Sequence, residues 1–226
     1  MMDPDWSDHA RKLRELLKND DVANFRDWDI IRQTCHITGP AKWMNAERKA
    51  LLENGWDIDK LTHTEVHQYY HAMMMEKLMG IEELGAGQDD NFVEIGGGYG
   101  VLASALASPS RANYTIIDIP EMLEIQRYNL GPLAEDGMVT LITDPSDAVV
   151  DSHTLVIALW SLSELDEIGR KEFLRVFDAA GAWFVAYQKQ WQDIDNVAWF
   201  EENLGGERLK IEHPAGNYYG WENQHI

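Results

Sequence analysis

The feature that most constrains the fold is the segment Glu94-Ile95-Gly96-Gly97-Gly98-Tyr99-Gly100, which follows a short apolar run and precedes the helix-forming run 101–106. Glycine adopts backbone angles that other residues avoid, and it lets the backbone approach a ligand closely. The helix that follows presents free amide groups at its N-terminus, where a flat or anionic ligand can sit. The order of strand, glycine loop and helix predicts a ligand site at the edge of an α/β sheet.

From residue 91 onward, short apolar runs alternate with helical stretches, which is typical of βαβ units and a parallel sheet. Strands are expected at 92–95, 114–118, 139–142, 154–159 and 183–187, and helices at 101–107, 122–130, 166–179 and 196–203. Two further strands, 208–212 and 218–224, are too close for a helical crossover and should pair antiparallel. The predicted fold class is α/β, with a seven-stranded, mostly parallel sheet.

The first 88 residues are expected to be helical, at about 8–19, 40–54 and 62–79. The third helix has the better start signal, because Thr62-His63-Thr64-Glu65 fits a capping box. We expect residues 1–88 to form a helical lid that recognises the substrate, packed on a sheet domain at 89–226.

The charge balance narrows the choice of partners. The chain has 39 acidic and 19 basic residues, a formal net charge of -20, which repels phosphate backbones and anionic lipid surfaces. We therefore expect no nucleic-acid and no membrane partner, while association with further copies of the chain stays open. The single cysteine, Cys35, excludes an internal disulfide, and the lack of a leader or an 18-residue apolar run predicts a cytoplasmic protein.

The glycine loop alone fits two kinds of cofactor, since 98–103 also matches the G-x-G-x-x-A pattern of dinucleotide enzymes. Glu94, two places before the first glycine, suits a cationic ligand and would sit badly beside a pyrophosphate. Asp118, at the end of the second expected strand, lies where an acid accepts hydrogen bonds from ribose hydroxyls. With the antiparallel pair at the C-terminus, these acids favour an amino-acid-like nucleoside cofactor over a nicotinamide.

These residues carry a family resemblance. The run 93–100 resembles motif I of the class I S-adenosylmethionine-dependent methyltransferases. Together with Ile117-Asp118-Ile119-Pro120-Glu121-Met122-Leu123, Gln126, Tyr128 and Leu130, the chain more narrowly resembles the sugar O-methyltransferases, and Ser161-Leu162-Ser163-Glu164 and Gly216-Asn217 with Trp221 are consistent with that group.

The resemblance implies a Rossmann-like class I methyltransferase with S-adenosyl-L-methionine as cofactor and a sugar hydroxyl of a small glycan or activated sugar as acceptor. Three alternatives stay open: an amine or carbon of another small metabolite as acceptor, a non-catalytic subunit of the same fold, and a nicotinamide oxidoreductase. The residues implied for the cofactor are Glu94, Gly96, Gly97, Gly98, Asp118, Ile119, Asp144, Trp160 and Ser161.

Some of these residues have simpler interpretations. Asp144 stands in Thr143-Asp144-Pro145, which is also an ordinary turn. Ser161 and Glu164, and likewise Ser163 and Asp166, have the spacing of helix-capping boxes.

Methyl transfer to a hydroxyl needs a base to remove the proton. His63, His67 and His71 recur every four residues and share one face of the expected third helix, so His67 or His71 is the preferred base, with Glu164 as the rival. The same spacing suits a metal. However, 63–67 is not the His-Glu-x-x-His motif and His63 lies in the first turn, so no metal is expected.

Overall fold

The computed structural model describes residues 41–55, 57, 61, 63–80, 91–107, 113–210 and 217–223. The strands are β1 Asn91–Ile95, β2 Tyr114–Ile117, β3 Val139–Ile142, β4 Thr154–Leu159, β5 Ala182–Gln188, β6 Gln190–Trp191, β7 Ile194–Asp195, β8 Glu207–Lys210 and β9 Asn217–Asn223. The helices are α3 Ala41–Glu53, α4 His63–Met79, α5 Val101–Leu106, α6 Pro120–Leu130, α7 Pro132–Glu135, α8 Glu167–Ala179 and α9 Asn196–Asn203. The helix expected at 8–19, the residue Thr62 and the boundary expected at 88 lie outside these residues.

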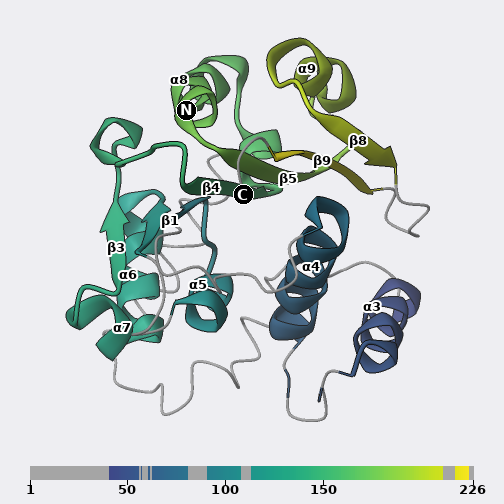
Figure 1. Cartoon of the computed structure of the whole chain (residues 1–226), viewed down its shortest axis with the longest axis horizontal. Helices are drawn as coiled ribbons and strands as arrows, with labels where there is room; N and C mark the ends of the chain where they lie inside the picture. Colours follow the sequence, from purple (N-terminus) through teal and green to yellow (C-terminus); the bar gives the residue numbers. More distant parts are fainter. Residues whose placement is uncertain are drawn as a thin grey trace.

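Seven strands form one sheet in the order β3-β2-β1-β4-β5-β9-β8. Neighbouring strands from β3 to β5 run parallel, whereas β9 lies antiparallel between β5 and β8. Figure 1 shows α8 and α9 on one side of this sheet and α4 and α5 on the other. The predicted fold class, with a mostly parallel sheet and an antiparallel last hairpin, is confirmed.

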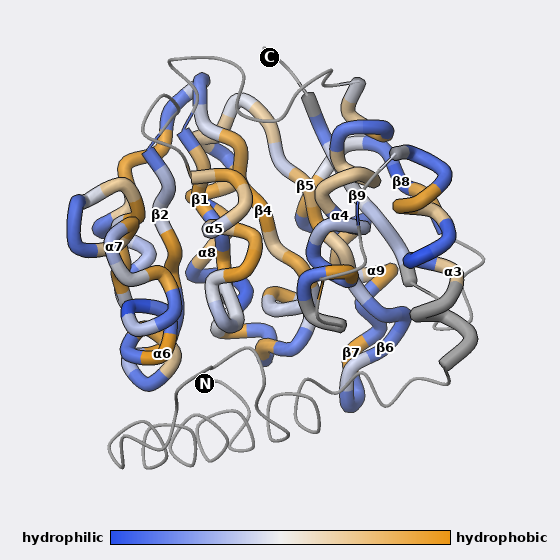
Figure 2. Tube along the Cα trace, turned by 90° about the horizontal axis from the view of Figure 1, so that it is seen from below, coloured by the Kyte–Doolittle hydropathy of each residue, from blue (hydrophilic) through white to orange (hydrophobic). Residues whose placement is uncertain are grey.

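Successive side chains of the central strands enter two different apolar layers, because side chains alternate between the faces of a strand. Leu155 and Ile157 of β4 pack in the layer under α4 and α5, while Val156 and Ala158 pack in the layer under α8 and α9. All six residues of β4 are buried, as expected for a parallel strand covered on both faces. Figure 2 shows these central strands as the apolar interior of the molecule.

Helix α4 contributes to the core. Its methionines, Met73, Met74 and Met75, belong to the same apolar cluster as Phe184 of β5 and Tyr219 of β9. The methionine run is therefore packing, as its flexible side chains suit. Because α4 lies against the sheet, its polar residues are placed relative to the strand ends.

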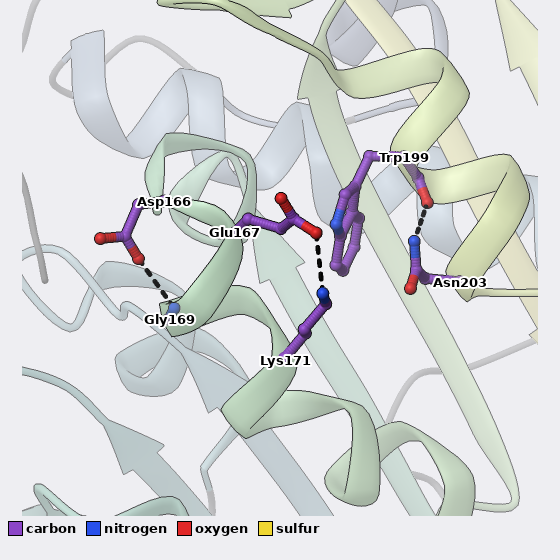
Figure 3. Close-up of polar contacts among 6 residues, drawn as sticks. All are labelled: Asp166, Glu167, Gly169, Lys171, Trp199 and Asn203. Atoms are coloured by element: carbon purple, nitrogen blue, oxygen red, sulfur yellow. Dashed lines mark hydrogen bonds and ion pairs between the residues drawn. The ribbon is translucent and has the colours of Figure 1, made fainter.

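Neither of the two capping boxes expected from the sequence, Ser161 with Glu164 and Ser163 with Asp166, is formed. Asp166 itself caps α8, where its carboxylate accepts a hydrogen bond from the Gly169 amide at 2.8 Å (Figure 3). The hydroxyl of Ser163 instead donates toward the Trp160 carbonyl and the Gln188 side chain, and the 3-10 helix Ser161–Glu164 has no side-chain cap. Because α8 begins at Glu167, its N-cap lies at Asp166, three residues after Ser163.

The small hairpin of β6 and β7 was not predicted from the sequence. Each strand has two residues, too few to show a period of two, and Gln192 with Asp193 forms the turn between them. Gln192 has a φ of 49°, in the region that tight hairpins usually fill with glycine or asparagine.

None of the helices in the described part of the chain combines the length and the apolar composition that a membrane span needs.

Candidate active site

The site lies where the direction of strand addition reverses. The chain moves from β1 outward to β2 and β3, and then returns to place β4 on the other side of β1. In open α/β sheets, ligands bind outside the carboxyl ends of the strands at this switch point. The glycine loop follows β1, and Trp160 with the 3-10 helix Ser161–Glu164 follows β4.

The two loops at the switch point are in direct contact. The Ser161 hydroxyl donates to the Ile95 carbonyl at the end of β1. Gly96 has a φ of 71°, and a Cβ on it would come within 2.2 Å of the Ser161 Cβ. Only glycine fits at this position, so the loop after β4 sets the path of the loop after β1. Ser161, expected to contact a cofactor, uses its hydroxyl to hold this junction.

Gly98 lies at the open part of the glycine loop. Its φ is 54°, and a Cβ built on it would meet nothing within 4 Å. Gly97 is different, because a Cβ there would come within 2.7 Å of the Ile116 Cγ2 and 3.2 Å of the Glu94 Oε2. The loop is therefore packed on the sheet at Gly97 and leaves backbone accessible at Gly98, where a ligand can approach.

Asp118 follows β2 and is tied to the glycine loop through Gln126 of α6. Its Oδ1 accepts from the Ile119 amide at 2.8 Å, and its Oδ2 accepts from the Gln126 Nε2 at 2.7 Å. The same Nε2 donates to the Gly98 carbonyl at 2.9 Å. The carboxylate also accepts a hydrogen bond from the Gly97 amide, so one of its about four acceptor positions remains for a ligand hydroxyl. Gln126 is among the residues that carry the family resemblance, but the sequence predicts no role for it.

Burial shifts the pKa of Asp118. The carboxyl is buried, and desolvation raises its pKa from 3.8 to about 7 against the opposing hydrogen bonds from Ile119, Gln126 and Gly97. The proton is therefore nearly balanced between bound and free at neutral pH. A cation beside the carboxyl would favour its ionised form.

Glu94 lies beneath the loop, next to Gly97. Its Oε2 accepts from the Tyr114 hydroxyl at 2.9 Å. Desolvation raises the pKa of Glu94 to about 7, although the Tyr114 hydrogen bond opposes that rise. Glu94 and Asp118 therefore lie at the ends of adjacent strands, and the pKa of each carboxyl is close to neutral pH.

Asp144 follows β3 and is exposed. Its Oδ1 accepts from the Ser146 amide at 2.7 Å and caps the 3-10 helix Pro145–Asp147. Hydrogen bonds from the Ser146 side chain and from its amide lower the pKa of Asp144. The turn interpretation of Asp144 is therefore seen in the structure, while a contact with a cofactor remains a prediction.

Trp160 joins the strand end to helix α4. Its φ of 62° is rare for a bulky residue, and its amide donates to the Ala186 carbonyl at 2.7 Å. Its indole stacks on the His67 ring at a centroid distance of 4.6 Å and meets the His71 ring edge-on at 4.5 Å. Two of the predicted histidines therefore lie beside the loop that follows β4. The side chain of His63 lies outside the described residues.

Two residues with no sequence signal complete this cluster. The Glu47 Oε1 lies 2.9 Å from the His67 Nδ1, and the Tyr219 hydroxyl lies 2.6 Å from the His71 Nδ1. Glu47 comes from α3 and Tyr219 from β9, so only the tertiary fold brings them to α4. Glu164, the rival base, is half-buried at the end of its 3-10 helix, and its role remains a prediction.

No family model and no curated protein matches the sequence. Solved structures do match the fold. The methyltransferase domain of bacterial CtHen1-CN has a TM-score of 0.51 at 14% identity, covering 69% of this chain and 96% of that chain. Magnesium protoporphyrin IX methyltransferase from Synechocystis PCC 6803, solved with bound S-adenosylmethionine, has a TM-score of 0.50 at 16% identity, covering 74% and 85%. The chain therefore has the class I S-adenosylmethionine-dependent methyltransferase fold.

Proposed function

We propose that this chain is an S-adenosylmethionine-dependent methyltransferase that methylates a sugar hydroxyl of a small glycan or activated sugar. The observation that carries the proposal is the bridge from Asp118 through Gln126 to the Gly98 carbonyl, which ties an acid at the end of β2 to the open part of the glycine loop. This bridge lies at the switch point of the fold, where ligands of open α/β sheets bind.

The residues present fit this cofactor. The Gln126 Oε1 is buried and has no hydrogen-bond partner among the described residues, so it suits a donor group on a ligand. Asp118 would accept from the ribose hydroxyls, while Glu94 would favour the positively charged methionine portion above Gly96, Gly97 and Gly98. Ile119 and Asp144 would lie toward the adenine. When bound, the cofactor supplies a methyl group on a positively charged sulfur.

The acceptor side is proposed at Trp160, His67 and His71. Methyl transfer is an in-line displacement, so the main task of the protein is to align donor and acceptor. A positioned group that takes up the hydroxyl proton typically adds about 100- to 10,000-fold in rate. We therefore expect replacement of either histidine to lower turnover and leave cofactor affinity intact. The sugar as acceptor rests on the sequence resemblance in residues 92–130.

Calorimetry with S-adenosylhomocysteine tests the cofactor. We expect one site per chain and at least tenfold weaker binding by Asp118→Ala. Asp178→Ala is a suitable control, because Asp178 is an exposed acid on α8. Absence of binding, or equal affinity in Asp118→Ala and the wild type, would overturn the assignment.

A panel of acceptors with labelled S-adenosylmethionine tests the substrate. Transfer to sugar hydroxyls is the expected result. Transfer to amines or carbon acids alone would move the proposal to another small metabolite. Cofactor binding without turnover on any acceptor would contradict catalysis and favour a non-catalytic subunit.

A further inference from the structure

Three side chains that commonly bind metals converge beside the proposed acceptor position. They are Glu47 of α3 and His67 and His71 of α4, and one ligand atom from each lies within 4.8 Å of the other two. Glu47 and His71 are buried, and the His67 side chain is 15% exposed. None of the three belongs to the proposed cofactor site at the glycine loop.

We propose that Glu47, His67 and His71 bind one divalent transition-metal ion. The two histidines are four residues apart, so they share one face of α4, as the two histidines of helical zinc motifs do. The His67 Nδ1 and the Glu47 Oε1 lie 2.9 Å apart, about 0.5 Å closer than two ligands of a tetrahedral ion that each lie about 2.0–2.1 Å from it.

The three ligand atoms lie within 4.8 Å of one another, whereas two ligands of a tetrahedral ion lie about 3.4 Å apart. Metal binding therefore requires changes of up to about 1.4 Å in the separations between these atoms. Rotation of the Glu47 side chain and of the imidazoles can supply such a movement, because all three project from helices that pack on each other.

Outer contacts orient the two imidazoles. The Tyr219 hydroxyl is hydrogen-bonded to the His71 Nδ1 at 2.6 Å, which leaves the Nε2 of that ring as the nitrogen for a metal. The Trp160 indole stacks on the His67 ring with an interplanar angle of 12°. Metal-ligating histidines usually have a hydrogen-bond partner on the other ring nitrogen, as His71 has in Tyr219, and this partner fixes the tautomer and the ring orientation.

The ligand set selects the kind of ion. Magnesium and calcium prefer oxygen ligands, whereas imidazole suits zinc, iron, cobalt and nickel. Two histidines and one carboxylate are the ligands of several catalytic zinc sites and of non-haem iron sites, and three protein ligands leave at least one coordination position open. A divalent ion would also neutralise the Glu47 carboxylate, which is costly to bury alone as a charge.

The position gives the ion a functional consequence, and this step rests on the proposed function. The cluster touches Trp160, which directly follows β4 at the switch point. A divalent ion lowers the pKa of an oxygen that coordinates to it. An acceptor hydroxyl in the open position would therefore release its proton to water more readily, and its oxygen would then take the methyl group. In that case the histidines act as metal ligands and not as the base.

Metal binding itself can be tested without a cofactor or an acceptor. Full-length, tag-free protein is treated with a chelator, dialysed and titrated with Co²⁺, Zn²⁺ and Mg²⁺. We expect one Co²⁺ per chain with visible absorption bands, competition by Zn²⁺, no competition by Mg²⁺, and a higher Tm with Zn²⁺. Glu47→Gln keeps the shape of the side chain and should weaken binding at least tenfold, as should His67→Ala.

Two further variants complete the design. His153→Ala, which removes an exposed histidine far from the cluster in sequence, should bind Co²⁺ as the wild type does. Tyr219→Phe removes only the outer contact and should weaken binding about 10- to 100-fold. Circular dichroism checks that each variant folds, and Glu47→Gln decides the question if a histidine variant does not fold.

Two results would overturn the metal site. One is wild-type protein that takes up no Co²⁺ or Zn²⁺, which would reduce the cluster to a hydrogen-bonded pair of Glu47 and His67. The other is uptake that Glu47→Gln and His67→Ala leave unchanged. Either result leaves the cofactor proposal intact, because S-adenosylhomocysteine binding is measured separately.

Discussion

Glu94 is expected to destabilise the free protein at neutral pH. Its pKa rises from an ordinary value of 4.5 to about 7 on folding, because burial disfavours the carboxylate. Between those two values the folded state holds the proton and the unfolded state has lost it, so stability is full below pH 4.5 and falls as the pH rises to 7. The difference between the two pKa values corresponds to a loss of about 3 kcal/mol in unfolding free energy, and this loss is complete above pH 7.

Glu94→Gln removes this ionisation with little change in shape. The amide oxygen can still accept from the Tyr114 hydroxyl, which bonds the Glu94 Oε2 in the wild type. Relative to the wild type, the variant should therefore gain about 2 kcal/mol in unfolding free energy between pH 5.5 and pH 8, the part of the titration that lies in this interval. The same change should weaken binding of a cationic cofactor.

Urea unfolding at several pH values gives the unfolding free energy of each protein as a function of pH. The comparison is between the two pH dependences, so any effect of the substitution that is the same at every pH cancels. Glu167→Gln is the matched control, because Glu167 is exposed and pairs with Lys171 on the surface of α8 (Figure 3). Its profile should not show the gain at high pH. Parallel pH profiles for Glu94→Gln and the wild type would refute the argument that burial raises the Glu94 pKa.

Two other predictions follow from the same contacts. The ammonium group of S-adenosylhomocysteine beside Glu94 and the ribose hydroxyls on Asp118 should lower both pKa values, so binding should release about 1 to 1.5 protons at pH 6.5; equal binding heats in buffers with different ionisation enthalpies would contradict this. Asp166→Ala removes the cap of α8 and should cost about 1 kcal/mol, a fall in Tm of about 2–4 °C, without changing ligand affinity. An unchanged Tm would show that the cap contributes nothing.

The strands could be predicted because the sheet is covered on both faces. The expected ranges 139–142 and 154–159 match β3 and β4, and the expected helix 196–203 matches α9. Their apolar runs are bounded by turn residues, so each boundary is a local feature of the sequence. The hairpin of β6 and β7 has no such signal, because its strands are too short and Gln192 stands where glycine is usual.

The residues near the glycine loop and those near helix α4 also differ in how far the sequence predicts their arrangement. The proximity of Glu94, the glycine loop and Asp118 could be predicted because they lie at the ends of adjacent strands within 25 residues of sequence. The cluster around His67 and His71, the proposed acceptor side, could be predicted only in part. The spacing of His67 and His71 was visible, but Glu47 reaches His67 from another helix, and the hydrogen bond between Tyr219 and His71 spans 148 residues.

Trp160 links the glycine loop and helix α4 through a strained backbone. A φ of 62° at a bulky residue costs about 1–3 kcal/mol and persists only where the surroundings hold it. The β5 carbonyl of Ala186 holds it on one side and the rings of His67 and His71 hold it on the other. The next residue, Ser161, packs on Gly96. A shift of α4 would therefore move the glycine loop as well, so one short turn sets the distance between the proposed methyl donor and the acceptor.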